Sequence, residues 1–420
     1  MKVNSLLFWF LIACLYFSCR PAREVHKESP DLIERLMKNR PEDFSDILRN
    51  RDSLRVQVIY TQIDRDKQNK PAFTNYFFNV DPAQYYYPAS TVKLPTVLLA
   101  LEKINSMEKL GVHPNTSMIT ESNSDYQSPV YNDPTSEDGR PTIEHYLKKI
   151  LLVSDNDAFN RLYEFLGQEH INQQLHKKGF QQTDILHRLS ILLPEEENRK
   201  TNPILFLDDS SRVLISQPME YNKSEYPVRK DSLGLGYYSK GQLINQPMNF
   251  SSKNRLPLEE LHSMMRTLMF PLSVREKQRF DLTNDQYRFV WKYLSQYPSE
   301  GNYPPYDSSE YWDAYGKFLY WGGEKGRIPK NFRSFSKEGD AYGFLVDAAY
   351  IIDFDKNIEF LLSAIIYCNK DGILNDDQYD YKTVGLPFLK NLGRVIYDHE
   401  LQRQRTRQPD LSTFRMEYGN

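Results

Sequence analysis

Ser90 and Lys93 stand three residues apart, just before the apolar run 94–101. This run predicts a helix that begins at the serine. Positions i and i+3 share one helical face, so the Lys93 ammonium group can reach the Ser90 hydroxyl. A hydroxyl at a helix N-terminus also lies near unpaired backbone N–H groups, which favour developing negative charge. The pair is a candidate activated nucleophile, although a serine at a helix start is more often only an N-cap.

A second polar motif, Ser154-Asp155-Asn156, lies between two predicted helices at residues 142–153 and 158–166. A short break between helices lets polar side chains project into a cleft. The same residue types also occur wherever a helix is capped, so the motif alone is weak evidence for a site.

The third motif is Lys337-x-Gly339, which opens a predicted strand near the C-terminus. The ordered motifs Ser90-x-x-Lys93, Ser154-Asp155-Asn156 and Lys337-x-Gly339 resemble those of the penicillin-recognising serine enzymes. The resemblance is closest to the class A β-lactamases, whose signature is S-x-x-K, S-D-N and K-T-G. It extends from residue 54 to the C-terminal helix and leaves an insertion at 201–255 unmatched.

The resemblance implies a role for each matching residue. Ser90 is expected to be the acylated nucleophile, with Lys93 as its base or proton relay. Ser154 is expected to pass a proton to the leaving nitrogen, and Asn156 to hold the substrate amide and Lys93. Lys337 is expected to supply positive charge to Ser154 and to a substrate carboxylate.

Acyl transfer also needs a stabilised oxyanion, and the resemblance assigns this task to the backbone N–H groups of Ser90 and Asp340. Lys93 can act as a base only if its pKa falls, which partial burial and the neighbouring cation Lys337 would favour. The set then needs no histidine base. No metal site, cofactor or nucleic-acid partner is expected, because the 8 histidines and 3 cysteines form no ligand pattern and the net charge is −3.

Two departures from the family pattern concern substrate binding. Glu338 stands where the family has Thr or Ser, whose hydroxyl binds the substrate carboxylate, and Asp340 follows the expected substrate-binding Gly339. An anion at position 338 would repel a β-lactam carboxylate unless it turns away or pairs with a basic residue. Either the substrate differs, or these carboxylates point outward.

A further departure concerns deacylation, for which class A enzymes use a loop Glu four residues before an Asn. Pro194 holds that position before Asn198, and an alignment on residues 186–188 puts Ser190 there instead. The glutamates 195–197 are out of register. Three hypotheses follow: a β-lactamase-like hydrolase, a D,D-peptidase or transpeptidase with a D-alanyl peptide-like substrate, and a penicillin-binding sensor with impaired turnover.

The pattern of elements predicts an α/β fold. Strands at 54–64, 72–80, 332–336, 342–352 and 358–367 are expected to form an antiparallel sheet from both chain ends, with residues 337–340 as a connection. Helices are expected at 31–50, 142–153, 158–166, 170–186, 257–269, 283–294 and 384–403. We expect a single domain over 31–420 with an all-helical subdomain at about 108–300, and the aromatic stretch 303–321 is a candidate cleft mouth.

The N-terminus has the layout of an export signal. Residues 6–17 are apolar but too short to span a membrane, which takes ~20 residues. Residues 16–19 resemble a relaxed bacterial lipobox, so residues 1–18 are expected to be removed and Cys19 to be lipidated. Residues 19–30 would then form a tether that holds the domain at a membrane, in the periplasm or on the outer surface. Secretion without a lipid is the alternative.

Overall fold

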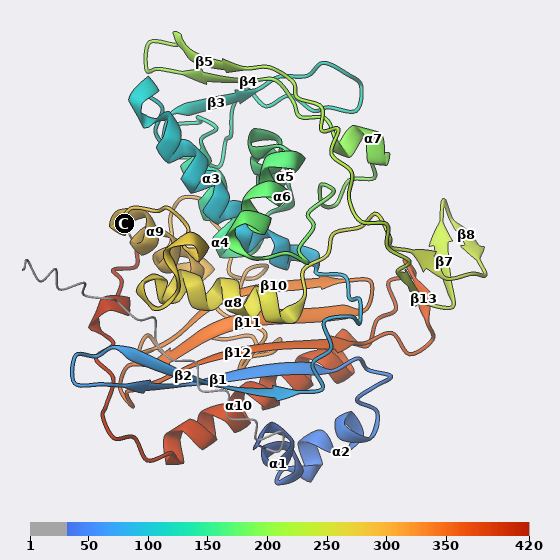
Figure 1. Ribbon diagram of the computed structural model, residues 1–420, viewed down its shortest axis with the longest axis vertical. Helices are drawn as coiled ribbons and strands as arrows, with labels where there is room; N and C mark the ends of the chain where they lie inside the picture. The colour runs from blue at the N-terminus through green and yellow to red at the C-terminus, as the bar shows by residue number, and fades with distance from the viewer. Residues whose placement is uncertain (1–31, 420) are drawn as a thin grey trace, which may run out of the picture.

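The computed structural model describes residues 32–419, and these form an antiparallel sheet flanked by helices (Figure 1). The five strands lie in the order β10-β11-β12-β1-β2, so the two ends of the chain share one sheet. The predicted α/β fold is confirmed. The strands are β1 (Gln57–Arg65), β2 (Pro71–Phe78), β10 (Phe332–Ala341), β11 (Phe344–Asp353) and β12 (Ile358–Tyr367).

Strands β11 and β12 read as continuous apolar runs because helices cover both faces of the sheet. Helices α8 (Leu258–Met269) and α9 (Asn284–Ser295) lie on one face of the sheet. Helix α10 (Leu386–Gln402) lies on the other face with α1 (Leu32–Lys38) and α2 (Pro41–Arg49) (Figure 1). Every residue of β11 is buried as a result.

The predicted helix at 31–50 is two helices, α1 (Leu32–Lys38) and α2 (Pro41–Arg49). Pro41 has no N–H to continue the first helix, but it fits the first turn of a new one. The predicted helix at 170–186 also differs, because α6 (Gln168–Lys178) ends at Gly179, which has a φ of +102°. Glycine adopts this left-handed conformation without steric cost.

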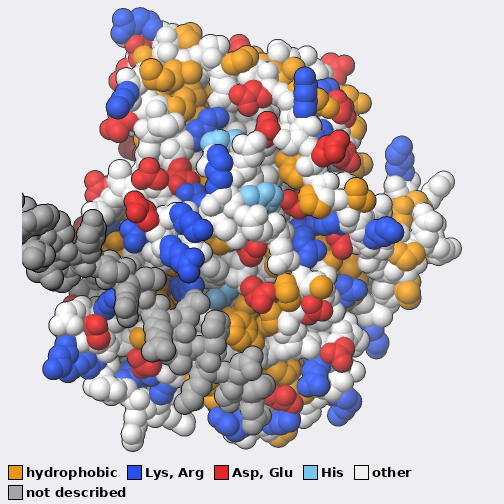
Figure 2. Space-filling model, in the orientation of Figure 1, with side chains coloured by type: hydrophobic (Ala, Val, Ile, Leu, Met, Phe, Trp, Pro, Cys, Tyr) orange, Lys and Arg blue, Asp and Glu red, His pale blue; other side chains and the backbone are white. Residues whose placement is uncertain are grey.

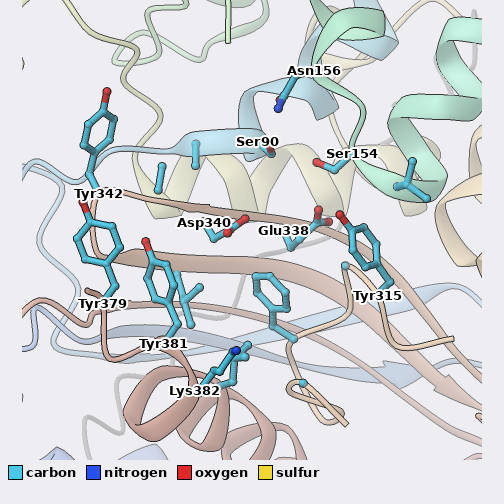
Figure 3. A pocket seen from close by; sticks show the side chains of 18 of the residues that line it. Ser90, Ser154, Asn156, Tyr315, Glu338, Asp340, Tyr342, Tyr379, Tyr381 and Lys382 are labelled. Atoms are coloured by element: carbon cyan, nitrogen blue, oxygen red, sulfur yellow. The ribbon is translucent and has the colours of Figure 1, made fainter. Parts of the chain in front are cut away.

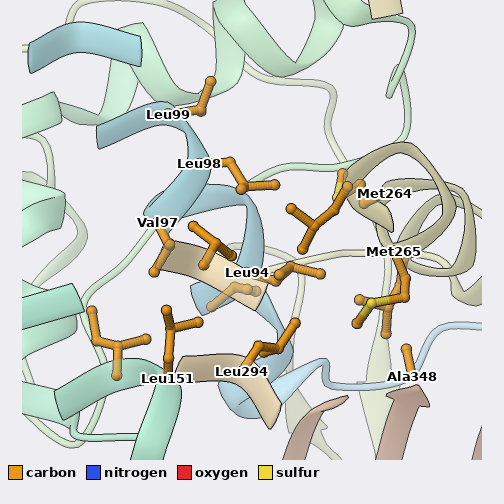
Figure 4. Packing of buried hydrophobic residues seen from close by; sticks show 14 of the residues in the cluster. Leu94, Val97, Leu98, Leu99, Leu151, Met264, Met265, Leu294 and Ala348 are labelled. Atoms are coloured by element: carbon orange, nitrogen blue, oxygen red, sulfur yellow. The ribbon is translucent and has the colours of Figure 1, made fainter. Parts of the chain in front are cut away.

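The helical region is built around α3 (Lys93–Met107), which is buried nearly all round and packs against α4 (Ile143–Val153), α5 (Asn156–Leu166) and α6. Figure 4 shows Leu94, Val97 and Leu98 of α3 among apolar side chains from α4, α8 and α9. This packing sets the position of the first residues of α3, where the serine–lysine pair lies.

Short strands add to the helices between residues 108 and 300. One small sheet has the order β3-β4-β5, where β3 is Ser117–Thr120, and another has the order β13-β7-β8, where β13 is Ile373–Leu374. The insertion supplies the other short strands: β4 (Ile204–Leu207), β5 (Val213–Gln217), β6 (Ser232–Leu233), β7 (Gly236–Ser239), β8 (Gln242–Ile244) and β9 (Met248–Asn249). The region is therefore mainly, and not entirely, helical. These strands are too short to show the alternation of apolar and polar residues by which a strand is predicted from sequence.

Residues 337–340 were expected to connect two strands. This prediction is wrong, because they form the last part of β10. The connection is instead the tight turn at Tyr342 and Gly343, which have φ values of +51° and +83°. A two-residue hairpin loop with two successive positive φ values matches the right-handed twist of the strands that it joins. The third motif consequently lies on the edge strand of the sheet.

The predicted signal, the tether and Cys19 lie outside the described residues. No helix among residues 32–419 is long and apolar enough to cross a membrane. Cys368 is free and buried, in keeping with the role of a small apolar residue.

Candidate active site

Ser90 lies in a 3₁₀ turn (Ala89–Val92) that leads directly into α3 at Lys93, so the α-helix begins three residues later than predicted. Side chains at i and i+3 eclipse in a 3₁₀ turn, and the pair therefore still meets. Lys93 Nζ lies 2.8 Å from Ser90 Oγ.

Lys93 is fully buried and also contacts the second motif. Its Nζ lies 2.7 Å from Asn156 Oδ1, 3.2 Å from Ser154 Oγ and 2.5 Å from the Ser154 carbonyl oxygen. Burial, followed by the positive charge of Lys337, lowers the pKa of Lys93 well below its usual value. The amine is therefore suited to take a proton from Ser90.

One residue of the second motif caps a helix, and the other two belong to the site. Asp155 caps α5, because its carboxylate accepts a hydrogen bond from the Ala158 N–H at 2.7 Å. Ser154 has a φ of +62° at the end of α4, and this turn exposes its hydroxyl to the cavity. The neighbouring Asp155 serves as the cap, and Ser154 and Asn156 face Lys93.

Ser154 lies between two lysine amino groups. Its Oγ is 3.2 Å from Lys93 Nζ and 2.9 Å from Lys337 Nζ. Lys337 is itself buried, with 1% of its surface exposed. A hydroxyl between two amines can carry a proton from one group to another, as leaving-group protonation requires.

Gly339 lets β10 approach the nucleophile. A Cβ at this position would lie 2.9 Å from the Ser90 backbone nitrogen and 2.8 Å from the Pro88 carbonyl oxygen, closer than such atoms can pack. The backbone of β10 therefore passes directly beside that of Ser90. This approach brings together the two chain segments whose N–H groups, at Ser90 and Asp340, were expected to form the oxyanion hole.

Glu338 pairs with a basic residue, which is one of the two arrangements considered from the sequence. Its carboxylate Oε2 lies 3.0 Å from Lys337 Nζ. Burial opposes ionisation of Glu338, but the charge and hydrogen bond of Lys337 outweigh it and lower the pKa of the carboxyl. The Glu338 side chain also lines the cavity, so the carboxylate is not turned away from the site.

Asp340 lies on the same face of β10 and also lines the cavity. Its carboxylate has no hydrogen-bond or ion-pair partner from another residue among residues 32–419. The carboxyl is exposed to the cavity. Desolvation by the surrounding walls, followed by the negative charge of Glu338, raises its pKa to about 6.

A cavity of about 700 Å³ contains the site and has Ser90, Ser154, Asn156, Glu338 and Asp340 in its wall (Figure 3). Its other wall residues include the aromatic side chains of Tyr87, Trp312, Tyr315, Tyr342, Tyr379 and Tyr381. Trp312 and Tyr315 come from the stretch that was a candidate cleft mouth. The remaining four were not predicted, because nothing in their local sequence separates them from core tyrosines.

Ser190 is the site residue whose contacts sequence reasoning missed. Its Oγ accepts a hydrogen bond from Asn156 Nδ2 at 2.7 Å, and it lines the cavity with a φ of +57°. The alternative alignment had placed Ser190 at the position of the deacylating Glu. The structure puts the Ser190 hydroxyl next to Asn156.

The out-of-register glutamates lie on the short helix α7 (Glu195–Asn198) and do not line the cavity. Glu195 pairs with Arg199, Glu197 pairs with Lys200, and Glu196 accepts a hydrogen bond from the Tyr221 hydroxyl. No carboxylate among the described residues hydrogen-bonds to Lys93 or Asn156. The same part of the chain contains no group of three or more His, Cys, Asp or Glu side chains that could hold a metal ion.

The antiparallel sheet flanked by helices and the contacts of Lys93 with Ser90 and of Lys337 with Ser154 are the features that the resemblance to β-lactamase-like serine hydrolases predicts. Residues 40–214, less than half of the chain, match the model of the beta-lactamase enzyme family (Beta-lactamase2). No curated protein matches the sequence.

Several solved structures are similar to the chain over most of its length. A class A beta-lactamase from Clostridium kluyveri DSM 555 is 15% identical, with a TM-score of 0.47, over 84% of this chain and 97% of that one. A beta-lactamase from Burkholderia phymatum is 13% identical, also with a TM-score of 0.47, over 87% and 98%. An ancestral class A beta-lactamase (GNCA) is 14% identical, with a TM-score of 0.45, over 87% and 99%.

Proposed function

We propose that the protein forms an acyl-serine intermediate on Ser90 and hydrolyses a β-lactam or a related amide. The observation that carries this proposal is the position of Lys93 Nζ, within hydrogen-bond distance of Ser90 Oγ, Ser154 Oγ and Asn156 Oδ1. A single buried amine with a lowered pKa thus contacts both the nucleophile and the group that leads to the leaving nitrogen.

In the first step, Ser90 Oγ attacks the carbonyl carbon while the neutral Lys93 amine takes the hydroxyl proton. The carbonyl oxygen becomes an oxyanion, stabilised by the backbone N–H groups of Ser90 and Asp340. The C–N bond then breaks. The departing nitrogen receives the Ser154 proton, and Lys93 returns its own proton to Ser154.

In the second step, water attacks the ester carbon and the C–O bond to Ser90 breaks. The products are a carboxylic acid and the free serine hydroxyl. Ser190 occupies the place next to Asn156, and a hydroxyl is a far weaker base than a carboxylate. We therefore expect deacylation to be the slow step.

Slow attack by water favours a second candidate function, transfer of the acyl group to an amine as in a D,D-peptidase or transpeptidase. A turnover-impaired penicillin-binding sensor is the limiting case of the same chemistry. Intact-mass spectrometry with a β-lactam separates the three. Rapid return to the unmodified mass indicates a hydrolase, loss of the adduct only when an amine is added indicates a transferase, and a persistent adduct indicates a sensor.

We further propose that the protein is exported and anchored by a lipid on Cys19. The apolar segment 6–17 followed by Ser18 and Cys19 supports this placement. Metabolic labelling with an alkyne fatty acid tests it, since Cys19→Ser should abolish incorporation.

A further inference from the structure

A substrate carboxylate needs an unpaired cation beside Ser90, and the cation at this place is already paired. Lys337 is the cation beside Ser154, but its Nζ already contacts the Glu338 carboxylate at 3.0 Å and the Glu338 carbonyl oxygen at 3.1 Å. Glu338 thus holds the place beside Lys337 that an incoming carboxylate would take. A second anion brought to this pair would gain little attraction and would meet repulsion from Glu338.

Asp340 adds a carboxylate that forms no ion pair with a basic side chain among residues 32–419. It faces the cavity two residues beyond Glu338. Lys382 is a cavity-wall cation that forms no ion pair with either acid. With Lys93 neutral and Lys337 paired with Glu338, Asp340 remains as the β10 carboxylate of the cavity wall that forms no ion pair within the described part of the chain.

Aromatic rings surround the two acids. Tyr315 lies beside Glu338, and Tyr381 lies near Asp340 on the opposite side (Figure 3). Burial, followed by the charge of Glu338 and then that of Asp340, raises the pKa of Tyr315 to about 12, so this phenol stays neutral. Tyr379 lies 5.2 Å from Tyr381, centroid to centroid, and extends the same wall. Aromatic faces together with a free carboxylate suit an organic ammonium group, through cation–π attraction and a charge-assisted hydrogen bond.

We propose that the substrate of the Ser90 site carries an ammonium group that binds Asp340 within the cavity lined by Tyr315, Tyr379 and Tyr381, and that it has no carboxylate at Lys337. This inference rests on the proposed acyl-serine chemistry and names the substrate class: cationic, amine-bearing acyl compounds. Asp340 is the specificity-determining residue, because it is the β10 acid of the cavity wall that forms no ion pair with a protein cation among the described residues.

Three 4-nitrophenyl esters with acyl groups of similar size test the inference: β-alanyl (ammonium), butyryl (neutral) and succinyl (carboxylate). Acylation is followed as the burst of nitrophenolate, with intact mass to confirm the adduct. We expect the β-alanyl ester to acylate about tenfold faster than the butyryl ester, and the succinyl ester to be slowest. Asp340→Asn should reduce the preference to about twofold or less. Asp285→Asn, an exposed acid in the first turn of α9, should retain it.

Inhibition of the butyryl reaction by propylammonium or propionate tests the same site on the unmodified protein and does not depend on how the variant folds. Propylammonium should inhibit at lower concentration. Equal acylation rates for the three esters, or a preference that survives Asp340→Asn, would overturn the inference while leaving the acyl-serine chemistry standing. If no ester acylates Ser90, the proposed function fails and the inference fails with it.

Discussion

The Glu338 carboxylate lies 3.0 Å from Lys337 Nζ, and the same nitrogen lies 2.9 Å from Ser154 Oγ. The cation expected to attract a substrate carboxylate is therefore paired with the next residue of its own strand. This pairing separates two properties of the site: the groups for acyl transfer are assembled, but the attraction for a carboxylate is reduced.

Replacing Glu338 with threonine should increase the rate of acylation by a β-lactam about tenfold. The variant removes the anion from Lys337 and adds a hydroxyl, and a gain of 1.4 kcal/mol in the transition state corresponds to a factor of ten. Stopped-flow measurement with a chromogenic cephalosporin gives the rate. Glu338→Gln is the matched control, because it removes the charge and keeps the shape. Unchanged rates in both variants would show that the Glu338 charge does not limit acylation.

Lys93→Arg should reduce acylation by a factor of about 10² to 10⁴, which is the usual contribution of general acid–base catalysis. A guanidinium group stays protonated, so it cannot take the Ser90 proton. Lys103→Arg is the control on the same helix, since Lys103 is also largely buried but contacts Phe165 and Gln217 outside the cavity. A Lys93→Arg variant that acylates at the wild-type rate would rule out Lys93 as the base.

Introducing a carboxylate at position 190 should speed up release of the acyl group. Ser190 lines the cavity 2.7 Å from Asn156 Nδ2, so a glutamate there could orient and deprotonate a water molecule near the ester. Ser190→Glu is expected to shorten the lifetime of the β-lactam adduct at least tenfold, measured by intact mass after removal of free β-lactam.

The glutamates of α7 provide the matching negative test. Glu195→Gln and Glu197→Gln should leave the adduct lifetime unchanged, because both side chains form ion pairs outside the cavity. A slower release in either variant would place the natural base on α7.

Asp347 should make the stability of the protein depend on pH. This fully buried residue pairs across the sheet with Glu338 and accepts hydrogen bonds from the Phe318 and Leu319 N–H groups. Burial raises its pKa to about 7. Because the folded state keeps the proton and the unfolded state loses it near pH 4, the free energy of unfolding falls as pH rises from 4 to 7.

Asp347→Asn removes this titration. Relative to the variant, the wild type should lose roughly 2–4 kcal/mol of unfolding free energy between pH 4 and 8, at ~1.4 kcal/mol per pKa unit. Urea denaturation at a series of pH values measures the difference. Parallel curves for the two proteins would mean that Asp347 has the same pKa in the folded and unfolded states.

The sequence predicted the parts of the fold that depend on local pattern. Strands β11 and β12 are long apolar runs, and helices α4, α8 and α9 have clear amphipathic spacing, so their bounds came within a few residues. The short strands of the insertion have no such pattern and form only by pairing with distant segments, as β13 does with β7.

The same distinction holds for the site. The proximity of Ser90 to Lys93 follows from helical geometry. The role of Gly339 depends on how closely β10 passes the Ser90 backbone, and only the folded chain shows this. Ser190 and Tyr379 reach the cavity from loops whose paths no local rule predicts. The pairing of Glu338 with Lys337 was one of two stated alternatives, and the structure distinguishes them.

The most direct test of the central claim is covalent labelling with a fluorescent penicillin, followed by intact mass and peptide mapping. We predict one adduct per chain on Ser90 in the wild type, none in Ser90→Ala, and normal labelling in Ser106→Ala, a control serine near the other end of α3. Labelling that persists in Ser90→Ala, or an adduct mapped to another residue, would contradict the assignment of Ser90 as the nucleophile.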